Sequence, residues 1–475
     1  MRLTSACMLA LVLIARALQA NAQGADHSGG HGGDAIRCTS GKPEIAVIAC
    51  TSIIQDKRED VDKRAIALRN RAFHYQQLGD LDHAIADYTT ALDHPEYGIQ
   101  AKTYSNRGLM YFLKGDEDHA LADYDKALAL DPKLVSSYVN RATIFIRRDE
   151  DERAIADLDQ AIQRKPDDAA VYVSRGTIYA GRGDASRAIT DFTKAIELNP
   201  ADAAAWRNRS FAYGALGDKS AAAADAAEAI RLSPDLAGAH VELGLSVEGS
   251  DRAARAIAEF DQAIKLNPRD AQAFKARGDA YLASGDPDRA LADFNRAIGL
   301  DARLTSAYID RGGAHMNKSE WDSAIADFGT AIALNPKIYE SYLNRGQAYG
   351  AKREREQAIA DFTQAIRLKA DAVDAYRQRA FFRQESGDSQ GALDDYDRAI
   401  ALNPRNAEAL RGRGYVRLNR HDADAAIADL SAAIALNPRD ALAFRFRGEA
   451  YSAKNDPRRA GLDYAAAIQL NPSVR

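Results

Sequence analysis

Ala188-Ile189-Thr190-Asp191-Phe192-Thr193-Lys194-Ala195-Ile196-Glu197-Leu198-Asn199-Pro200 is one copy of a phrase that recurs along the chain. The alanines at its first and eighth positions are present in all twelve copies. The first step between copies, from Ala84 to Ala120, is 36 residues long, and the other ten steps are 34 residues long. A large apolar residue such as Phe192 lies between the two alanines in eleven copies, and Ala226 is the exception. A fixed period of this length indicates a repeat protein.

Each copy also has a first half with helical spacing. In Trp206-Arg207-Asn208-Arg209-Ser210-Phe211-Ala212-Tyr213, the first aromatic residue is followed four residues later by a small residue and seven residues later by another aromatic. Turn signals such as Gly183-Asp184 often separate the halves. One helix pair cannot bury its apolar face alone, so the pairs are expected to stack on each other. We therefore expect an all-α, right-handed superhelical α-solenoid of about twelve 34-residue helix-turn-helix repeats.

The pattern over residues 65–474 resembles the tetratricopeptide repeat (TPR) family. Twelve copies in register make the resemblance specific. Two first helices carry Asn-Arg-Gly, at Asn106-Arg107-Gly108 and Asn344-Arg345-Gly346. This tripeptide is similar to a common bacterial variant of the family; the usual motif has leucine at the arginine position. The resemblance implies a scaffold whose first helices line a concave groove for partner peptides or domains.

An arginine recurs in the first helix and an acid recurs in the second. The arginines are Arg71, Arg107, Arg141, Arg175, Arg209, Arg277, Arg311, Arg345, Arg379, Arg413 and Arg447. The acids are Asp87, Asp123, Asp157, Asp191, Asp225, Glu259, Asp293, Asp327, Asp361, Asp395, Asp429 and Asp463. We expect bidentate pairs that support the stack, with Arg345 and Asp361 as one example. Pairing within a repeat and pairing between neighbouring repeats are both possible.

The sixth copy departs from the pattern. It has Leu243 in place of the arginine, and it alone has Glu259 in place of aspartate. His240 and Val247 replace its aromatics. We expect this copy to be the weakest junction of the array.

The N-terminal segment has the composition of an export signal. Arg2, an apolar run over residues 6–18 and the small residues around Ala22 predict a signal peptide over residues 1–22. Residues 23–36 are rich in glycine and histidine and are expected to form a flexible linker, without a metal site. The protein is accordingly expected to be exported, to the periplasm of a Gram-negative bacterium or beyond it.

Residues 37–64 are expected to form an N-terminal cap with a degenerate half-repeat, before a solenoid over residues 65–474. Cys38 and Cys50 are the only cysteines after the signal, and an oxidising periplasm favours a disulfide between them. Such a bond would tie an extended segment to the cap helix.

Composition and motifs exclude several classes of function. The chain carries 63 Lys and Arg against 68 Asp and Glu, which argues against a nucleic-acid-binding surface. The His-Glu-x-x-His, Cys-x-x-Cys, Gly-x-Ser-x-Gly and phosphate-binding loop motifs are absent from the sequence. The repeats leave no segment for a catalytic domain. We expect neither an enzyme nor a cofactor, and no membrane span in the mature chain.

Three arginines one repeat apart form a candidate peptide-binding row on the first helices: Arg377, Arg411 and Arg445. Phe381 and Tyr415 lie one turn further along two of these helices. A basic row with aromatics suits an acidic peptide. The alternative is a solvated face whose arginines are neutralised by nearby acids.

The end of the twelfth repeat is a second candidate surface. Ile468 and Leu470 are expected to face water there and to mediate contact with a partner or self-association. Together these features predict a non-enzymatic protein–protein interaction scaffold of the cell envelope. The alternative is a glycan-handling subunit of an envelope polysaccharide or peptidoglycan assembly machine.

Overall fold

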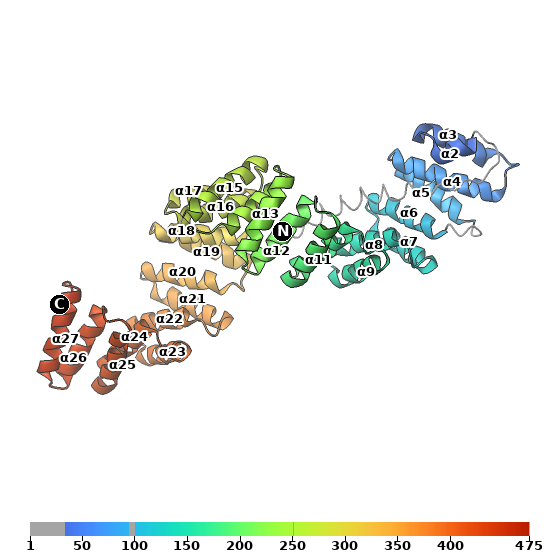
Figure 1. Cartoon of the computed structure of the whole chain (residues 1–475). Helices are drawn as coiled ribbons and strands as arrows, with labels where there is room; N and C mark the ends of the chain where they lie inside the picture. Colours follow the sequence, from blue (N-terminus) through green and yellow to red (C-terminus); the bar gives the residue numbers. More distant parts are fainter. Residues whose placement is uncertain (1–33, 95–99, 250, 475) are drawn as a thin grey trace. The chain divides into compact units, whose positions relative to one another are not determined.

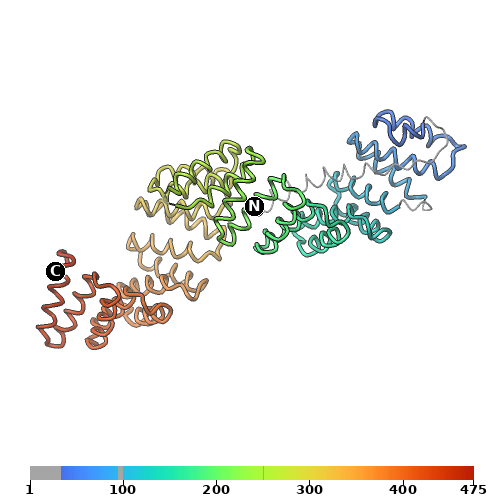
Figure 2. Tube along the Cα trace, in the orientation of Figure 1, coloured from blue at the N-terminus to red at the C-terminus, as the bar shows by residue number. Residues whose placement is uncertain are grey.

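The computed structural model describes residues 34–94, 100–249 and 251–474. The signal peptide and residues 23–33 of the expected linker lie outside these ranges. The described part is built from helices that run in antiparallel pairs (Figures 1 and 2). The helices are α2 (Asp34–Ser40), α3 (Pro43–Gln55), α4 (Val61–Gln77), α5 (Leu81–Leu92), α6 (Gln100–Leu113), α7 (Glu117–Leu130), α8 (Val135–Arg147), α9 (Asp151–Arg164), α10 (Ala169–Gly181), α11 (Ala185–Leu198), α12 (Ala203–Ala215), α13 (Lys219–Leu232), α14 (Ala237–Ser246), α15 (Arg252–Leu266), α16 (Ala271–Ala283), α17 (Pro287–Leu300), α18 (Thr305–Asn317), α19 (Trp321–Leu334), α20 (Tyr339–Ala351), α21 (Arg355–Leu368), α22 (Val373–Glu385), α23 (Ser389–Leu402), α24 (Ala407–Asn419), α25 (Ala423–Leu436), α26 (Ala441–Ala453) and α27 (Pro457–Leu470).

The chain divides into two compact units. The first ends at Glu248 and the second begins at Gly249. The division falls within the sixth repeat, where the sequence departs from the repeat pattern. Its first helix, α14, has 10 residues, whereas the first helices of the repeats before and after it, α12 and α16, have 13 each.

The recurring alanines let the two helices of a repeat approach closely. Both alanines of the quoted phrase, Ala188 and Ala195, are buried, and Phe192 between them is 1% exposed. A Cβ on Gly176 in the first helix would lie 2.8 Å from the Phe192 ring, so only a very small residue fits there. Burial of such a phenyl ring stabilises a repeat that contains it by about 2–3 kcal/mol.

Aspartate is the N-cap residue of many of the second helices. The side chain of Asp184 accepts a hydrogen bond from the backbone N–H of Arg187, three residues later. Gly183, just before it, has a φ of 80° and ends the preceding helix in the left-handed conformation. In the ninth repeat Arg353 adopts this conformation, with a φ of 63°, although it is not glycine.

The N-terminal region differs from the expected boundaries. Helix α2 begins at Asp34, inside the segment expected to be linker, and Cys38 lies within this helix rather than in an extended segment. Asp34 lies in the first turn of α2, where a negative charge stabilises a helix. The first helix of the first repeat, α4, begins at Val61, before the expected start at residue 65, because Asp60 caps it by accepting from the N–H of Asp62.

Candidate partner-binding surface

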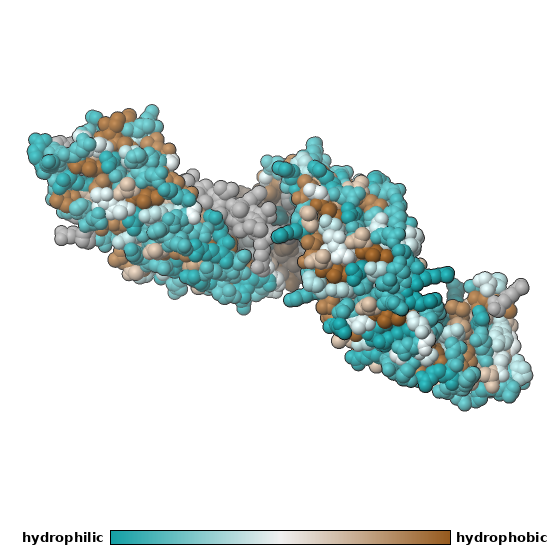
Figure 3. Space-filling model, turned by 180° about the vertical axis from the view of Figure 1, so that it is seen from behind, coloured by the Kyte–Doolittle hydropathy of each residue, from teal (hydrophilic) through white to brown (hydrophobic). Residues whose placement is uncertain are grey.

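The first helices form one layer of the array within each unit. Helix α12 packs on α14, and α22, α24 and α26 pack on one another in sequence. Side chains on these helices are therefore close to those of the next repeat. On the face shown in Figure 3, apolar side chains lie in small groups among hydrophilic ones.

The recurring arginine and aspartate pair within each repeat. In all eleven repeats that carry the arginine, its Nε and Nη2 donate to the two carboxylate oxygens of the same repeat's aspartate, at 2.6–2.9 Å. The hydrogen bonds to Asp361 raise the pKa of Arg345 above its ordinary value. This is the bidentate geometry that the planar guanidinium favours.

The same arginines also contact the preceding helix pair of the stack. Their third nitrogen, Nη1, donates to a side chain on the preceding second helix in ten of the eleven cases. The acceptors are Thr51, Thr89, Asp125, Asp159, Thr193, Asp261, Asn295, Thr363, Asp397 and Ser431. Arg345 is the exception, because Gly329 occupies the corresponding position. Each ladder arginine therefore joins its own helix pair, and most also join it to the pair before.

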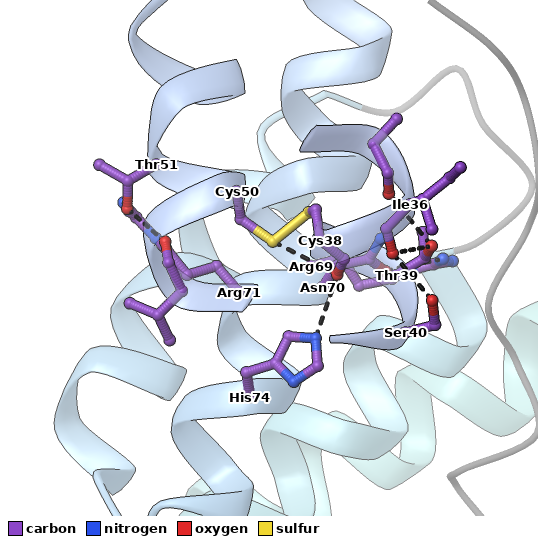
Figure 4. The surroundings of a disulfide bond; sticks show 12 residues. Ile36, Cys38, Thr39, Ser40, Cys50, Thr51, Arg69, Asn70, Arg71 and His74 are labelled. Carbon is purple, nitrogen blue, oxygen red and sulfur yellow. Dashed lines mark hydrogen bonds between the residues drawn. A yellow bond between two sulfur atoms is a disulfide. The ribbon is translucent and has the colours of Figure 1, made fainter. Parts of the chain in front are cut away.

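The N-terminal cap is held by covalent and polar contacts. Cys38 of α2 and Cys50 of α3 form a disulfide (Figure 4). His74 of α4 lies with its Nε2 3.0 Å from the carbonyl oxygen of Cys38. Arg71 of α4 donates to Thr51 of α3 at 2.8 Å, so α3 takes the place of a preceding second helix.

The three arginines of the expected row are each paired with an acid. Arg377 lies 2.8 Å from Glu408 of the next repeat, and Arg411 donates to Asp440 of the next repeat at 2.7 Å. Arg445 donates to Glu449 on its own helix at 3.0 Å. The row is therefore electrostatically balanced, and an acidic ligand would have to compete with these acids.

The two aromatics of the row have different surroundings. The side chain of Phe381 is 47% exposed and contacts Phe382 edge-on. Tyr415 packs against Phe446 of the next repeat, with ring centroids 4.4 Å apart. Phe381 is thus the aromatic of the pair that is available to a partner.

The structure shows two further charged groups on the first helices that the sequence reasoning missed. Arg207 of α12 faces Glu242 of α14, and Lys275 of α16 lies 2.8 Å from Asp310 of α18 and 2.7 Å from Asp279. In both cases the basic residue and the acid of the next repeat are 35 residues apart. That shared spacing was the signal that could have identified them.

Helix α27 exposes three apolar side chains. Ile468 is 43% exposed, Leu470 is 40% exposed and Leu462 is 68% exposed. Leu470 is no more exposed than Leu368 at the same position of an inner repeat, at 42%. The exposure of Leu470 is therefore common to this repeat position. Leu462, the most exposed of the three, was not among the residues predicted from the sequence. Self-association through this helix stays a prediction.

A membrane span and a metal site are two further features that the described part of the chain could carry. No helix there is both long enough and apolar enough to cross a bilayer. Within the same ranges, no three His, Cys, Asp or Glu residues are grouped so that they could hold a metal ion.

Three tetratricopeptide repeat models match the chain. One matches residues 101–134, a second matches residues 173–237, 241–304, 383–428 and 415–474, and a third matches residues 135–168 and 339–371. No curated protein matches the chain.

Several solved structures are similar to it. YrrB, a TPR protein with an unusual peptide-binding site, is 22% identical, with a TM-score of 0.36, 39% of this chain covered and 95% of that one. MamA is 25% identical, with a TM-score of 0.34 and coverage of 36% and 94%. Cut9–Hcn1 of the APC/C is 17% identical, with a TM-score of 0.47 and coverage of 88% of each chain. The family matches together span roughly two thirds of the sequence, at the period of the repeats and on helices paired as that motif requires, so the chain belongs to the tetratricopeptide repeat family.

Proposed function

We propose that this TPR protein is an exported scaffold of a Gram-negative cell envelope, which binds extended peptides or partner domains on its layer of first helices. TPR proteins bind peptide or protein partners. The finer assignment to the envelope rests on the signal-like residues 1–22 and on the Cys38–Cys50 pair, which suits an oxidising compartment.

One observation carries the proposal for the first helices. The ladder position holds arginine in eleven of twelve repeats, whereas the position two residues before it, where it is not buried, varies among Arg, Val, Lys, Ile and Leu. Uniform positions serve the stack, which is the same in every repeat. Within each unit, such a row of varied side chains suits recognition of a specific extended ligand, because each repeat can contact a different part of it.

A selection of random peptides displayed on phage against the full chain tests the proposal. We expect enriched peptides whose binding is lost when Phe381 on the first helix α22 is replaced by alanine. As a matched control, Leu130→Ala on the second helix α7 should leave binding unchanged; Leu130 is 53% exposed. Binding that survives the first-helix variant and is lost with Leu130→Ala would contradict the proposal.

Soluble peptidoglycan fragments form the second arm of the same experiment. Retention of these glycans, with no peptide enriched, would favour the glycan-handling alternative. The export part is tested separately by sequencing the N-terminus of the protein recovered from the periplasm, which we expect to begin at Gln23. An unprocessed N-terminus on cytoplasmic protein would contradict it.

A further inference from the structure

Arg207 and Glu242 form a pair unlike the ladder pairs. Arg207 lies on α12 and Glu242 on α14. The pair therefore joins the first helix of the fifth repeat to the first helix of the sixth. Their nearest charged atoms, Nη2 and Oε1, are 3.6 Å apart, which is beyond a hydrogen bond. The ladder pairs in the same unit, by contrast, are joined by two hydrogen bonds each, as Arg209 is to Asp225.

Both members of the pair have unmet hydrogen-bonding capacity. The side chain of Glu242 is 7% exposed, and no described residue donates a hydrogen bond to its carboxylate. The Nε of Arg207 is buried without an acceptor, and the hydrogen bond from its side chain, from Nη1, reaches Asn208 at 3.3 Å. Buried polar groups without partners destabilise a fold, so a protein that retains them often uses them for binding.

The surroundings hold the guanidinium in place and leave it accessible. A Cβ on Gly238 of α14 would lie 3.0 Å from the Nε of Arg207, so the absence of a side chain at this position lets the guanidinium rest on the helix backbone. The side chain of Arg207 remains 30% exposed. Phe211, one turn further along α12, is partly buried and offers an apolar neighbour on the same helix face.

The pair selects for a neutral ligand group that both donates and accepts. Above about pH 7, where Glu242 is ionised, a ligand carboxylate would be attracted by Arg207 but repelled by Glu242, and an ammonium would meet the opposite combination. A carboxamide supplies an oxygen to the guanidinium and an N–H to the carboxylate from two atoms bonded to the same carbon, without adding charge. We infer that Arg207 and Glu242 form a subsite that binds the side-chain carboxamide of an asparagine or glutamine in an extended peptide.

This inference rests on the proposed function, because the peptide must lie along the first helices. The probe is the phage-displayed peptide library, selected against the full chain at about pH 8, where Glu242 is ionised. We expect the enriched peptides to share an Asn or Gln at one position. Replacing a shared Gln by Glu or Leu in a synthetic peptide should weaken binding about 10-fold or more, as is typical of sites built to bond a particular polar group.

Two variants connect that preference to the pair. In Arg207→Leu/Glu242→Leu, which removes both charges together, the preference for Gln over Leu should fall to about 2-fold or less. In Glu242→Gln, which keeps the shape and the fold, the preference for Gln over Glu should shrink or reverse, because the repulsion of a ligand carboxylate is gone. The control is Lys352→Gln/Asp322→Asn, an inter-repeat ion pair outside the candidate peptide-binding row, which should leave the preference unchanged.

The outcomes separate the two proposals. A library that yields no binder to the first helices contradicts the proposed function and this subsite with it. Binders that require the first helices but share no Asn or Gln, or whose preference is unchanged in both pair variants, contradict the subsite alone. Retention of glycans in place of peptides also overturns it.

Discussion

Arg345 donates hydrogen bonds of 2.8 Å from both Nε and Nη2 to the two carboxylate oxygens of Asp361 in the same repeat. The aspartate is the more buried partner, with its side chain 7% exposed against 23% for the arginine. The arginine therefore neutralises a buried carboxylate that would otherwise have no cation, and the pair behaves as a unit.

Removing one member of this pair should cost more than removing both. We expect Arg345→Leu to lower the free energy of unfolding by about 1–3 kcal/mol, because it leaves the buried Asp361 carboxylate unpaired. Asp361→Leu should have a cost of the same order. The double variant should be more stable than the sum of the two changes predicts, as measured by denaturant unfolding. Additive effects would show that the two side chains are independent.

The missing contact of Arg345 can be supplied. Gly329→Thr places a hydroxyl where the threonines of other repeats accept from Nη1, and a Cβ there would lie 3.6 Å from that nitrogen, without a clash. We expect an increase of about 1 kcal/mol or more in the free energy of unfolding, from helix propensity and from the new hydrogen bond. Gly329→Ala is the control that measures the propensity alone. If Gly329→Thr is no more stable than Gly329→Ala after allowance for threonine's lower propensity, the third contact contributes nothing.

The disulfide should stabilise the N-terminal cap. The bond between Cys38 and Cys50, which are 12 residues apart, lowers the conformational entropy of the unfolded chain. In the chain-entropy account this stabilises the folded state by about 3 kcal/mol. Alkylation of the exported protein without reductant, followed by mass spectrometry, should find both cysteines unmodified. After reduction, amide exchange in α2 and α3 should increase while that in α10 is unchanged. Two alkylated thiols in the non-reduced protein would contradict the bond.

Glu242 should make stability depend on pH. Burial raises the pKa of Glu242 to about 7 in the folded protein, and Arg207 opposes the shift. The folded state therefore holds a proton that the unfolded chain releases above about pH 4.5, so stability is lost as the pH rises from about 4.5 to about 7. Compared with Glu242→Gln, the wild type should lose up to about 3 kcal/mol over this range. Parallel pH profiles of the two proteins would contradict the shift.

Self-association through α27 should depend on Ile468 more than on Leu470. Exposure of the leucine is a property of its repeat position, so it should contribute little to an interface. In sedimentation over a concentration range, we expect Ile468→Glu to weaken any association of the wild type, with Leu470→Glu as the comparison. A wild type that stays monomeric throughout, or equal effects of both changes, would count against an interface at this helix.

The repeat architecture could be predicted because it depends on spacing alone. Alanines seven residues apart, with a large apolar residue such as Phe192 between them, predict a helix pair wherever the pattern recurs. The Arg–Asp pairs could also be anticipated, but the sequence leaves open whether an arginine pairs within its own repeat or with the neighbouring one. In most repeats of the structure the arginine does both: Nε and Nη2 bond the aspartate of its own repeat, and Nη1 bonds the preceding helix pair. Arg207 and Glu242 were missed because each resembles an ordinary surface residue in its own helix. Their 35-residue separation, shared by Lys275 and Asp310, could have pointed to the contact, but it does not show that the packing of α12 on α14 buries the carboxylate.

The binding surface is the central claim, and footprinting by hydroxyl radicals tests it most directly. Oxidation of exposed side chains is measured on the full chain alone and with a selected peptide at saturation. We predict that the peptide protects Phe381 on the first helix α22, whereas Leu130 on the second helix α7 is oxidised equally in both samples. Protection of Leu130 with no change at Phe381 would contradict the assignment of the first helices as the partner-binding layer.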